Sequence, residues 1–204
     1  MYKIQTELLG AFFLTVAIGL TSNFLAIGLI LVALIYLGSG FSGSHYNPAV
    51  TIGAWISEEI STRQCIQYIF AQFSGAVLGS LLVWRIAETT FAPEPARSTS
   101  VAEFAVLEVI FSLLFVLVFL VMMFPEKKRK NPVYGLVIGL TLTACYIIAE
   151  PITGTGLNPA VSAAYILLDS INHGYSYYNA AIYILAPLVG GVGAAAIFRK
   201  MNPL

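Results

Sequence analysis

The sequence predicts an all-α integral membrane protein, with six transmembrane helices and two shorter re-entrant helices arranged as an inverted repeat. Three observations lead to this fold class. Hydrophobic residues make up 58% of the 204-residue chain and charged residues 10%, whereas a soluble domain carries about 25% charged residues. Six apolar segments approach the length of about 20 residues that spans a bilayer. Two further segments, one in each half, begin with the same letters, Asn-Pro-Ala-Val.

The six predicted transmembrane helices are apolar over most of their length. They cover residues 4–21, 23–41, 64–85, 101–124, 132–149 and 177–198. Ser61 precedes Gln64 with capping-box spacing, which favours a helix start at the third segment. Ser100 and Glu103 repeat this spacing at the fourth segment. Glu7 interrupts the first segment, where a cleavable signal peptide would be apolar, so we expect this helix to be retained.

A single domain over residues 1–204 is expected, because no linker or low-complexity tract divides the chain. Its halves cover about 1–87 and 101–199. They match in three places, namely Glu7 and Glu108, the two Asn-Pro-Ala-Val segments, and AQFSGAVLG (71–79) with APLVGGVGA (186–194). Three spans per half give the halves opposite orientations in the membrane. An inverted repeat of this kind predicts a site near the bilayer midplane, between the halves.

The basic residues predict the orientation in the membrane. With six spans, eight of the ten fall on the side of both termini: Lys3, Arg63, Lys127, Lys128, Arg129, Lys130, Arg199 and Lys200. Arg85 and Arg97 fall on the other side. The positive-inside rule therefore predicts that both termini are cytoplasmic. We interpret the run 127–130 as part of this signal rather than as a contact with anionic lipid, and the net charge of zero indicates no nucleic-acid partner.

The two Asn-Pro-Ala motifs predict two half-helices. They are Asn47-Pro48-Ala49 and Asn158-Pro159-Ala160. Asparagine is a good N-cap and proline fits the first helical position, so we expect helices over 47–56 and 158–168. The loops before them, at 42–47 and 151–158, should be re-entrant. Irregular backbone at membrane depth must be buried in protein or line a wet cavity.

In an inverted repeat, the starts of the two half-helices meet near the centre of the bilayer. Each start directs about half a positive charge at the meeting point, which disfavours cations and hydrated protons. The side-chain oxygens of Asn47 and Asn158 cap the helices, so we expect their NH₂ groups to donate into the lumen. The pattern therefore predicts a pore for small neutral molecules, with a barrier against positive charge.

These motifs resemble those of the aquaporin (major intrinsic protein) family over essentially the whole chain. The matching segments are TELLGAF, SGSHYNPAVTIG, AQFSGAVLG, LEVIFSLLFVLV, IGLTLTACYIIAEPITGTGLNPA and APLVGG. The resemblance implies a homotetramer with one pore in each protomer. It also implies passive, bidirectional flow of water or of small uncharged solutes such as glycerol, urea, ammonia or hydrogen peroxide.

The resemblance also implies roles for particular residues. Glu7 and Glu108 match buried glutamates that hold the loop backbones, and we favour this role over the alternative of a proton relay. His45 matches a loop histidine near the cytoplasmic mouth, where we favour steadying of the loop over a pH gate. The narrowest point of the pore falls on four positions: Ile27, Tyr146, Thr155 and Val161.

Three of these constriction positions depart from the pattern of water-selective members. Ile27 replaces an aromatic residue, Tyr146 a histidine and Val161 an arginine. The arginine would supply a fixed positive charge and a rigid fork of donors, so its loss puts strict water selectivity in doubt. Ser162 follows Val161 where glycerol channels have aspartate, and it is closer to the pattern of water channels.

Two further features concern the outer mouth. The first two spans are joined by a short polar connection at 21–23, which predicts a wide or thin vestibule there. Glu150 stands where the family usually has an apolar residue. We expect it either to rim the outer mouth or to pair with Arg85 or Arg97.

The favoured function is a passive channel. The alternatives are a non-conducting structural or interaction subunit that keeps the fold, and an ion-conducting relative, which the loss of arginine at Val161 favours. An enzyme is not expected, because His45 and His173 are far apart and no nucleophile, base and acid share a recognisable spacing. Cys65 and Cys145 lie in apolar stretches and indicate neither a disulfide framework nor a metal site. We expect no metal and no cofactor.

Overall fold

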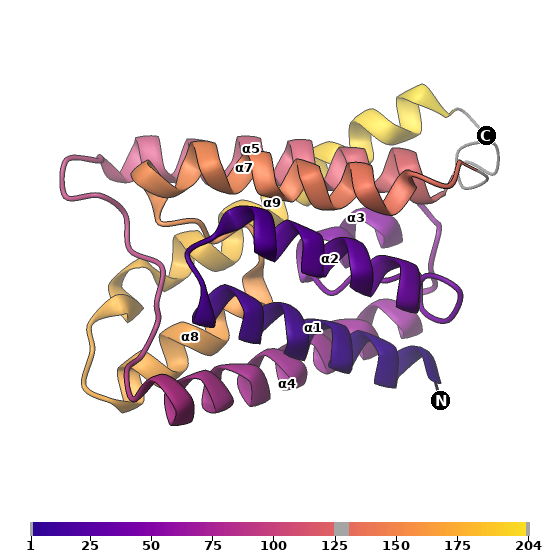
Figure 1. Cartoon of the computed structure of the whole chain (residues 1–204). Coiled ribbons are helices and arrows are strands. Elements are labelled where there is room, and N and C mark those ends of the chain that lie inside the picture. Colours follow the sequence, from indigo (N-terminus) through magenta and orange to yellow (C-terminus); the bar gives the residue numbers. More distant parts are fainter. Residues whose placement is uncertain (1, 125–130, 203–204) are drawn as a thin grey trace.

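The protein is a bundle of long helices with two half-helices between them (Figure 1). This computed structural model describes residues 2–124 and 131–202, and all regular structure within those ranges is helical. The basic run 127–130, on which part of the orientation argument rests, lies outside the described residues.

The two halves repeat one order of elements. The first half contains α1 (Tyr2–Leu20), α2 (Phe24–Gly38), the half-helix α3 (Pro48–Ile56) and α4 (Thr62–Ala87). The second contains α5 (Val101–Met123), α7 (Tyr134–Thr153), the half-helix α8 (Pro159–Ile171), a short 3₁₀ helix η1 (Ser176–Asn179) and α9 (Ala180–Met201). This order confirms the predicted all-helical fold with long helices and two shorter re-entrant ones.

Within the described ranges, five segments are long and apolar enough to cross a membrane: α1, α4, α5, α7 and the stretch Ser176–Met201. The second predicted span, 23–41, is shorter than expected. Helix α2 has 15 residues, about 22 Å at 1.5 Å per residue, against about 30 Å for the hydrocarbon core. It starts at Phe24 because Asn23 caps its first turn, with Oδ1 3.1 Å from the nitrogen of Ala26.

The predicted end of the fifth span at 149 is wrong, and so is the start of the second re-entrant loop at 151. Helix α7 continues through Pro151, which lacks an N–H to bond to the preceding turn but has a φ suited to a helix. The helix ends only at Gly154, which has a φ of 67° and donates its N–H to the carbonyl of Glu150 at 2.9 Å. The re-entrant loop therefore covers 154–158.

Equivalent helix pairs hold each half together, with α1 packed against α4 and α5 against α9. Gly75 on α4 lies against the carbonyl of Leu8, so that an added Cβ would be 2.1 Å from that oxygen. Gly190 takes the corresponding place on α9, where a Cβ would be 2.6 Å from the carbonyl oxygen of Val109. Since only glycine permits such close approach, the matching letters AQFSGAVLG and APLVGGVGA encode the same helix contact twice.

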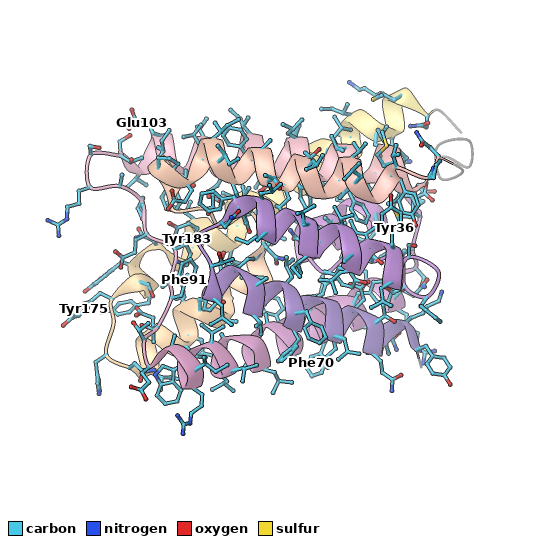
Figure 2. The ribbon with its side chains drawn as sticks, viewed as in Figure 1. Tyr36, Phe70, Phe91, Glu103, Tyr175 and Tyr183 are labelled. Carbon is cyan, nitrogen blue, oxygen red and sulfur yellow. The ribbon has the colours of Figure 1, made fainter. Side chains whose placement is uncertain are left out.

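The exterior and the two ends of the bundle differ in character. Apolar side chains cover the sides, where for example Phe70 on α4 points outward and is 74% exposed (Figure 2). The start of α1 and the end of α9 lie at one end of the bundle (Figure 1). The α4–α5 connection and η1 lie at the opposite end, which we call the distal end.

Candidate pore

The two half-helices begin at the predicted asparagines, and each asparagine caps its own helix. Asn47 Oδ1 accepts a hydrogen bond from the nitrogen of Ala49 at 2.8 Å. Asn158 Oδ1 accepts from the nitrogens of Ala160 at 3.1 Å and Val161 at 3.4 Å. The proline that follows each asparagine occupies the first turn, where a missing N–H costs nothing. The residue types at these positions therefore explain both helix starts locally.

The same two asparagines bridge the halves. Asn47 Nδ2 donates to the carbonyl of Leu157 at 2.9 Å, and Asn158 Nδ2 donates to the carbonyl of Tyr46 at 3.0 Å. The expectation that both NH₂ groups are free for the lumen is therefore wrong in part. One N–H of each amide is committed to the opposite loop, and one is left. The reciprocal bonds fix the two helix starts against each other.

The re-entrant loops share an unusual backbone. Residues one and three positions before each asparagine have left-handed φ: Tyr46 at 52° and Ser44 at 57°, Leu157 at 46° and Thr155 at 47°. Non-glycine residues seldom adopt this conformation, and it costs of order 1–3 kcal/mol each. The carbonyls of Tyr46 and Leu157, which receive the asparagine bonds, belong to these left-handed residues. The chain maintains this strain at the same places in both halves.

Glu7 holds the first loop. It is fully buried. Its Oε1 accepts hydrogen bonds from Ser42 Oγ at 2.6 Å and the nitrogen of His45 at 3.0 Å. Its Oε2 accepts from the nitrogen of Tyr46 and from Gln72 Nε2, both at 2.8 Å. All four partners are donors, so the arrangement fits an ionised carboxylate.

Glu108 holds the second loop in the corresponding way. Its Oε1 accepts from the nitrogen of Gly156 at 3.0 Å and its Oε2 from the nitrogen of Leu157 at 2.8 Å. These residues stand one and two positions before Asn158, as Tyr46 and His45 stand before Asn47. Buried Tyr183 donates from its hydroxyl to the carbonyl of Thr153 where the loop begins, and it lies inside the bundle (Figure 2).

His45 is buried beside α3, and its tautomer follows from its neighbours. Its Nδ1 lies 3.1 Å from Thr51 Oγ1. That hydroxyl donates its one hydrogen to the carbonyl of Asn47 at 3.1 Å and accepts from Gln72 Nε2 at 2.8 Å. With its hydrogen directed at Asn47, the hydroxyl accepts from the imidazole, an arrangement that favours the tautomer with the hydrogen on Nδ1. Nε2 is left as an acceptor and has no partner among the described residues.

A cavity of about 240 Å³ opens at the distal end, and we call it the distal vestibule. It is lined by Ile18, Thr21, Ser22, Phe24, Ile27, Phe91, Ala92, Pro93, Glu94, Tyr146, Glu150, Gly154 and Thr155. Three of the four predicted constriction residues thus meet there, namely Ile27, Tyr146 and Thr155. Val161, the fourth, is buried in the first turn of α8 and is not among the lining residues.

The segment 88–100, which we call the distal strap, closes over this vestibule. The nitrogen of Ala96 and the hydroxyl of Thr99 both donate to the carbonyl of Ile152, at 3.0 and 3.1 Å. Thr90 Oγ1 donates to Asp169 Oδ1 at 2.8 Å. The strap contributes Phe91 and Glu94 to the lining, a role that no pattern in the sequence predicted. Pro93 and Pro95 lie in this connection between two spans, and they were the sequence feature that could have indicated an ordered strap.

The position of Glu150 distinguishes between its two predicted roles. Glu150 lines the vestibule, and the ion pair recorded among the described residues joins Arg199 and Glu58 at 3.0 Å, away from it. Rimming of the mouth is therefore the alternative that the geometry favours.

Cys65 and Cys145 are free and buried, and a group of three potential metal ligands is absent from the described ranges.

Comparisons with known proteins agree with this architecture. The family model for the major intrinsic protein matches residues 3–198. Aquaporin Z of Rhodopseudomonas palustris is 30% identical over 98% of this chain and 93% of its own length. Aquaporin AqpM of Methanothermobacter marburgensis is 33% identical over 98% of this chain and 82% of its own length. The X-ray structure of the aquaglyceroporin from Plasmodium falciparum has a TM-score of 0.81 and 26% identity, covering 98% of this chain and 94% of that one. The chain therefore belongs to the major intrinsic protein family.

Proposed function

We propose that water and small uncharged solutes cross the membrane between the two Asn-Pro-Ala helix starts of this chain. The protein is an integral, multi-pass membrane channel of its family and not an enzyme. The observation that carries the path is the reciprocal pair of bonds from Asn47 to Leu157 and from Asn158 to Tyr46. It sets two half-helix N-termini head to head and leaves one amide N–H on each side for a passing oxygen.

The electrostatics of this meeting point favour neutral solutes. Each half-helix directs about half a positive charge toward it, and the carboxylates of Glu7 and Glu108 are occupied by the loop backbones. A cation therefore meets positive potential with no free anion beside it. Water, and solutes with hydroxyl or carbonyl oxygens, accept from the remaining N–H groups instead.

The constriction lies just distal to the helix starts, at Ile27, Tyr146, Thr155 and Val161. Two aliphatic side chains and a phenol ring stand among these four positions, and Tyr146 and Val161 take the places of a histidine and an arginine. Without a fixed cation or a donor fork at Val161, the constriction offers few competing hydrogen bonds and accepts solutes less polar than water. We therefore assign water together with small uncharged solutes, rather than water alone, as the permeating class.

Orientation and assembly follow the family pattern. Lys3, Arg63, Arg199 and Lys200 stand at the end of the bundle that carries the chain termini, which we assign to the cytoplasm by the positive-inside rule. Shallow apolar grooves mark the α1–α2 face of the first half and the α5–α7 face of the second. Contact of one face with the other on a neighbouring copy is heterologous, and such contacts form a ring when the rotation between copies closes. We assign a homotetramer, in which a rotation of a quarter turn closes the ring.

Osmotic shrinkage of proteoliposomes, followed by stopped-flow light scattering, tests the function. We expect shrinkage well above that of empty liposomes. Ile27→Trp, which fills the vestibule from α2, should reduce it toward the empty level. Leu29→Trp, placed on the same helix but 48% exposed on the side of the bundle, is the matched control and should conduct. Parent protein that shrinks vesicles no faster than lipid alone refutes the proposed function.

A further inference from the structure

The first turn of α2 carries an aromatic ring into the distal vestibule. Helix α2 begins at Phe24, at the distal end of the bundle (Figure 1), because Asn23 caps it there. Phe24 and Ile27 both line the vestibule. Phe24 precedes Ile27 by three residues, so its Cα stands about 4.5 Å nearer the distal end along the helix axis. A solute that enters from the distal side therefore passes Phe24 before it reaches the predicted constriction.

The backbone of Phe24 is held against α7. The hydroxyl of Thr143 on α7 lies 3.3 Å from the carbonyl oxygen of Phe24. One turn further along α2, glycines bring the two backbones together. A Cβ added to Gly28 would be 2.6 Å from the carbonyl oxygen of Gly139, and one added to Gly139 would be 2.5 Å from that of Gly28. Contacts at Phe24 and Gly28 therefore fix the first turn of α2 beside α7.

The ring of Phe24 pairs with a ring of the predicted constriction. Phe24 and Tyr146 lie edge to face, with centroids 6.0 Å apart and planes at 74°. This is one of the arrangements that aromatic pairs prefer. Tyr146 follows Thr143 by three residues on α7, so the contact that holds the backbone of Phe24 also brings the two rings together. Both rings line the vestibule, and each restricts the rotation of the other.

A third ring lines the vestibule from the distal strap. Phe91 lies at the distal end of the bundle (Figure 2) and is part of the lining. Its ring lies edge to face with that of Tyr165, with centroids 5.0 Å apart and planes at 73°. Tyr165 is itself anchored, because its buried hydroxyl donates to the carbonyl of Thr15 at 2.6 Å. The vestibule is thus walled by rings from α2, α7 and the strap, each held by a neighbouring contact.

We propose that Phe24, paired with Tyr146, sets the width of the solutes that the channel passes. The proposal rests on the proposed channel function and adds a specificity-determining residue to it. Of the four predicted constriction residues only Tyr146 is aromatic, and its ring partner comes from Phe24, outside that set. The selecting element is therefore centred about one helical turn distal to Ile27.

The ring pair selects by width, whereas the centre of the pore selects by hydrogen bonding and charge. A solute that carries an extra methyl group must displace a ring that its partner holds in place, and water, the narrowest solute, is the least affected. Polarity is tested separately at Asn47 and Asn158, where one amide N–H of each is left for the solute. A change at Phe24 should therefore alter width selection and leave the barrier to cations intact.

Uptake of urea, methylurea and symmetrical dimethylurea by proteoliposomes tests the width limit. These solutes share one carbonyl acceptor and grow by one methyl group at each step. Phe24→Ala removes the ring, and we expect the ratio of dimethylurea to urea uptake, each above the rate in empty liposomes, to rise by at least about tenfold, the discrimination that a single methylene gives at a pocket wall. Water flow and cation conductance should stay near the parent level. Phe24→Trp enlarges the ring and should lower the same ratio.

Two further variants test the pair and supply the control. Tyr146→Leu removes the partner ring and should also raise the ratio, and combining it with Phe24→Ala should raise the ratio by less than the product of the separate effects. Leu25→Ala truncates the next residue of the same helix, whose side chain is 49% exposed on the side of the bundle, and should keep the parent ratio.

The outcomes separate the proposal from the channel function. Equal ratios in the parent, Phe24→Ala and Phe24→Trp, with water flow intact in the parent, overturn the proposal alone. A rise of the same size in Leu25→Ala also overturns it, because loss of any side chain on α2 would then widen the path. A double variant that multiplies the two single effects overturns the pairing with Tyr146. Parent protein without water flow refutes the channel function and the proposal with it.

Discussion

The side-chain amide of Gln72 donates to Glu7 at 2.8 Å, and the corresponding position beside Glu108 is Pro187. The two buried glutamates are therefore not equally supported. Both accept two backbone N–H groups from their loops, but Glu7 also accepts from Ser42 and Gln72. The inverted repeat keeps the loop clamp in both halves, with two side-chain donors, Ser42 and Gln72, on Glu7 and one, Thr153, on Glu108.

Glu7→Gln should destabilise the protein more than Glu108→Gln does. The new NH₂ group of the first variant replaces an oxygen that accepts from two donors, so it loses charge-assisted bonds worth about 1.5–3 kcal/mol and meets repulsive neighbours. We expect a loss of about 3 kcal/mol for Glu7→Gln and about half of that for Glu108→Gln. Thermal unfolding in detergent measures both. Gln72→Met removes one supporting donor and should cost about 1 kcal/mol, and a larger loss for Glu108→Gln than for Glu7→Gln contradicts the argument.

Asn47→Asp should open the pore to cations. The substitution keeps the capping oxygen but replaces the amide that donates to Leu157 with a second oxygen. A negative charge then stands between the two positive helix ends, and at about 8 Å it attracts a cation by roughly 2 kcal/mol at an effective dielectric of 20. We expect cation conductance in planar bilayers to rise by at least about tenfold.

Asn23→Asp is the matched control for this experiment. Asn23 is also an N-cap, with Oδ1 3.1 Å from the nitrogen of Ala26, but it lies exposed at the start of α2. The cation conductance of Asn23→Asp should stay at the level of the parent protein. A rise of equal size in both variants would show that surface charge, rather than the pore centre, sets the conductance.

Local patterns predicted the helix starts well, because each start depends on residues within one turn. The capping box at Ser61 forms as expected, with its Oγ 3.2 Å from the nitrogen of Gln64, and the one at Ser100 does too. At the end of α7, the presence of Pro151 led to the wrong prediction that the helix stops before this proline. The helix end depends there on Gly154, whose left-handed backbone closes the last turn three residues later.

Contacts between segments that are far apart in the sequence could not be predicted from local sequence patterns. Capping by Asn47 follows from its neighbours, but its bond to Leu157 depends on how the two halves meet. The bond from Thr90 to Asp169 likewise joins segments that share no pattern in the sequence. The resemblance to a family supplied the constriction positions, yet it gave no indication that Glu94 would reach the vestibule.

Val161→Arg should narrow the range of permeating solutes and lower any cation leak. A fixed positive charge about 8 Å from a permeating cation adds roughly 2 kcal/mol to its barrier, which is about a thirtyfold reduction. We expect glycerol and urea uptake to fall more than water flow, since the long side chain also occupies the constriction. Permeability to water, glycerol, urea and cations, measured side by side for both proteins, tests this prediction.

Val101→Arg is the control. It adds the same charge at the start of α5, where the side chain is 70% exposed, and should leave all of these permeabilities unchanged. An identical panel for Val161→Arg would show that this position does not face the path.

Thr90→Val should loosen the distal strap. The Thr90 hydroxyl donates to Asp169 at 2.8 Å, and Asp169 also accepts from the nitrogen of Ser176 at 3.1 Å, so one carboxylate joins the strap to the start of η1. Losing a bond to a charged acceptor costs about 1.5–3 kcal/mol. We expect faster amide hydrogen exchange over residues 88–100 and a wider solute range, because the strap holds Phe91 and Glu94 at the vestibule. Thr89→Val removes a neighbouring hydroxyl that, among the described residues, makes one weak hydrogen bond, 3.4 Å long, to the carbonyl of Thr90. Equal exchange in the two variants would mean that the bonds from Ala96 and Thr99 to Ile152 hold the strap without help from Asp169.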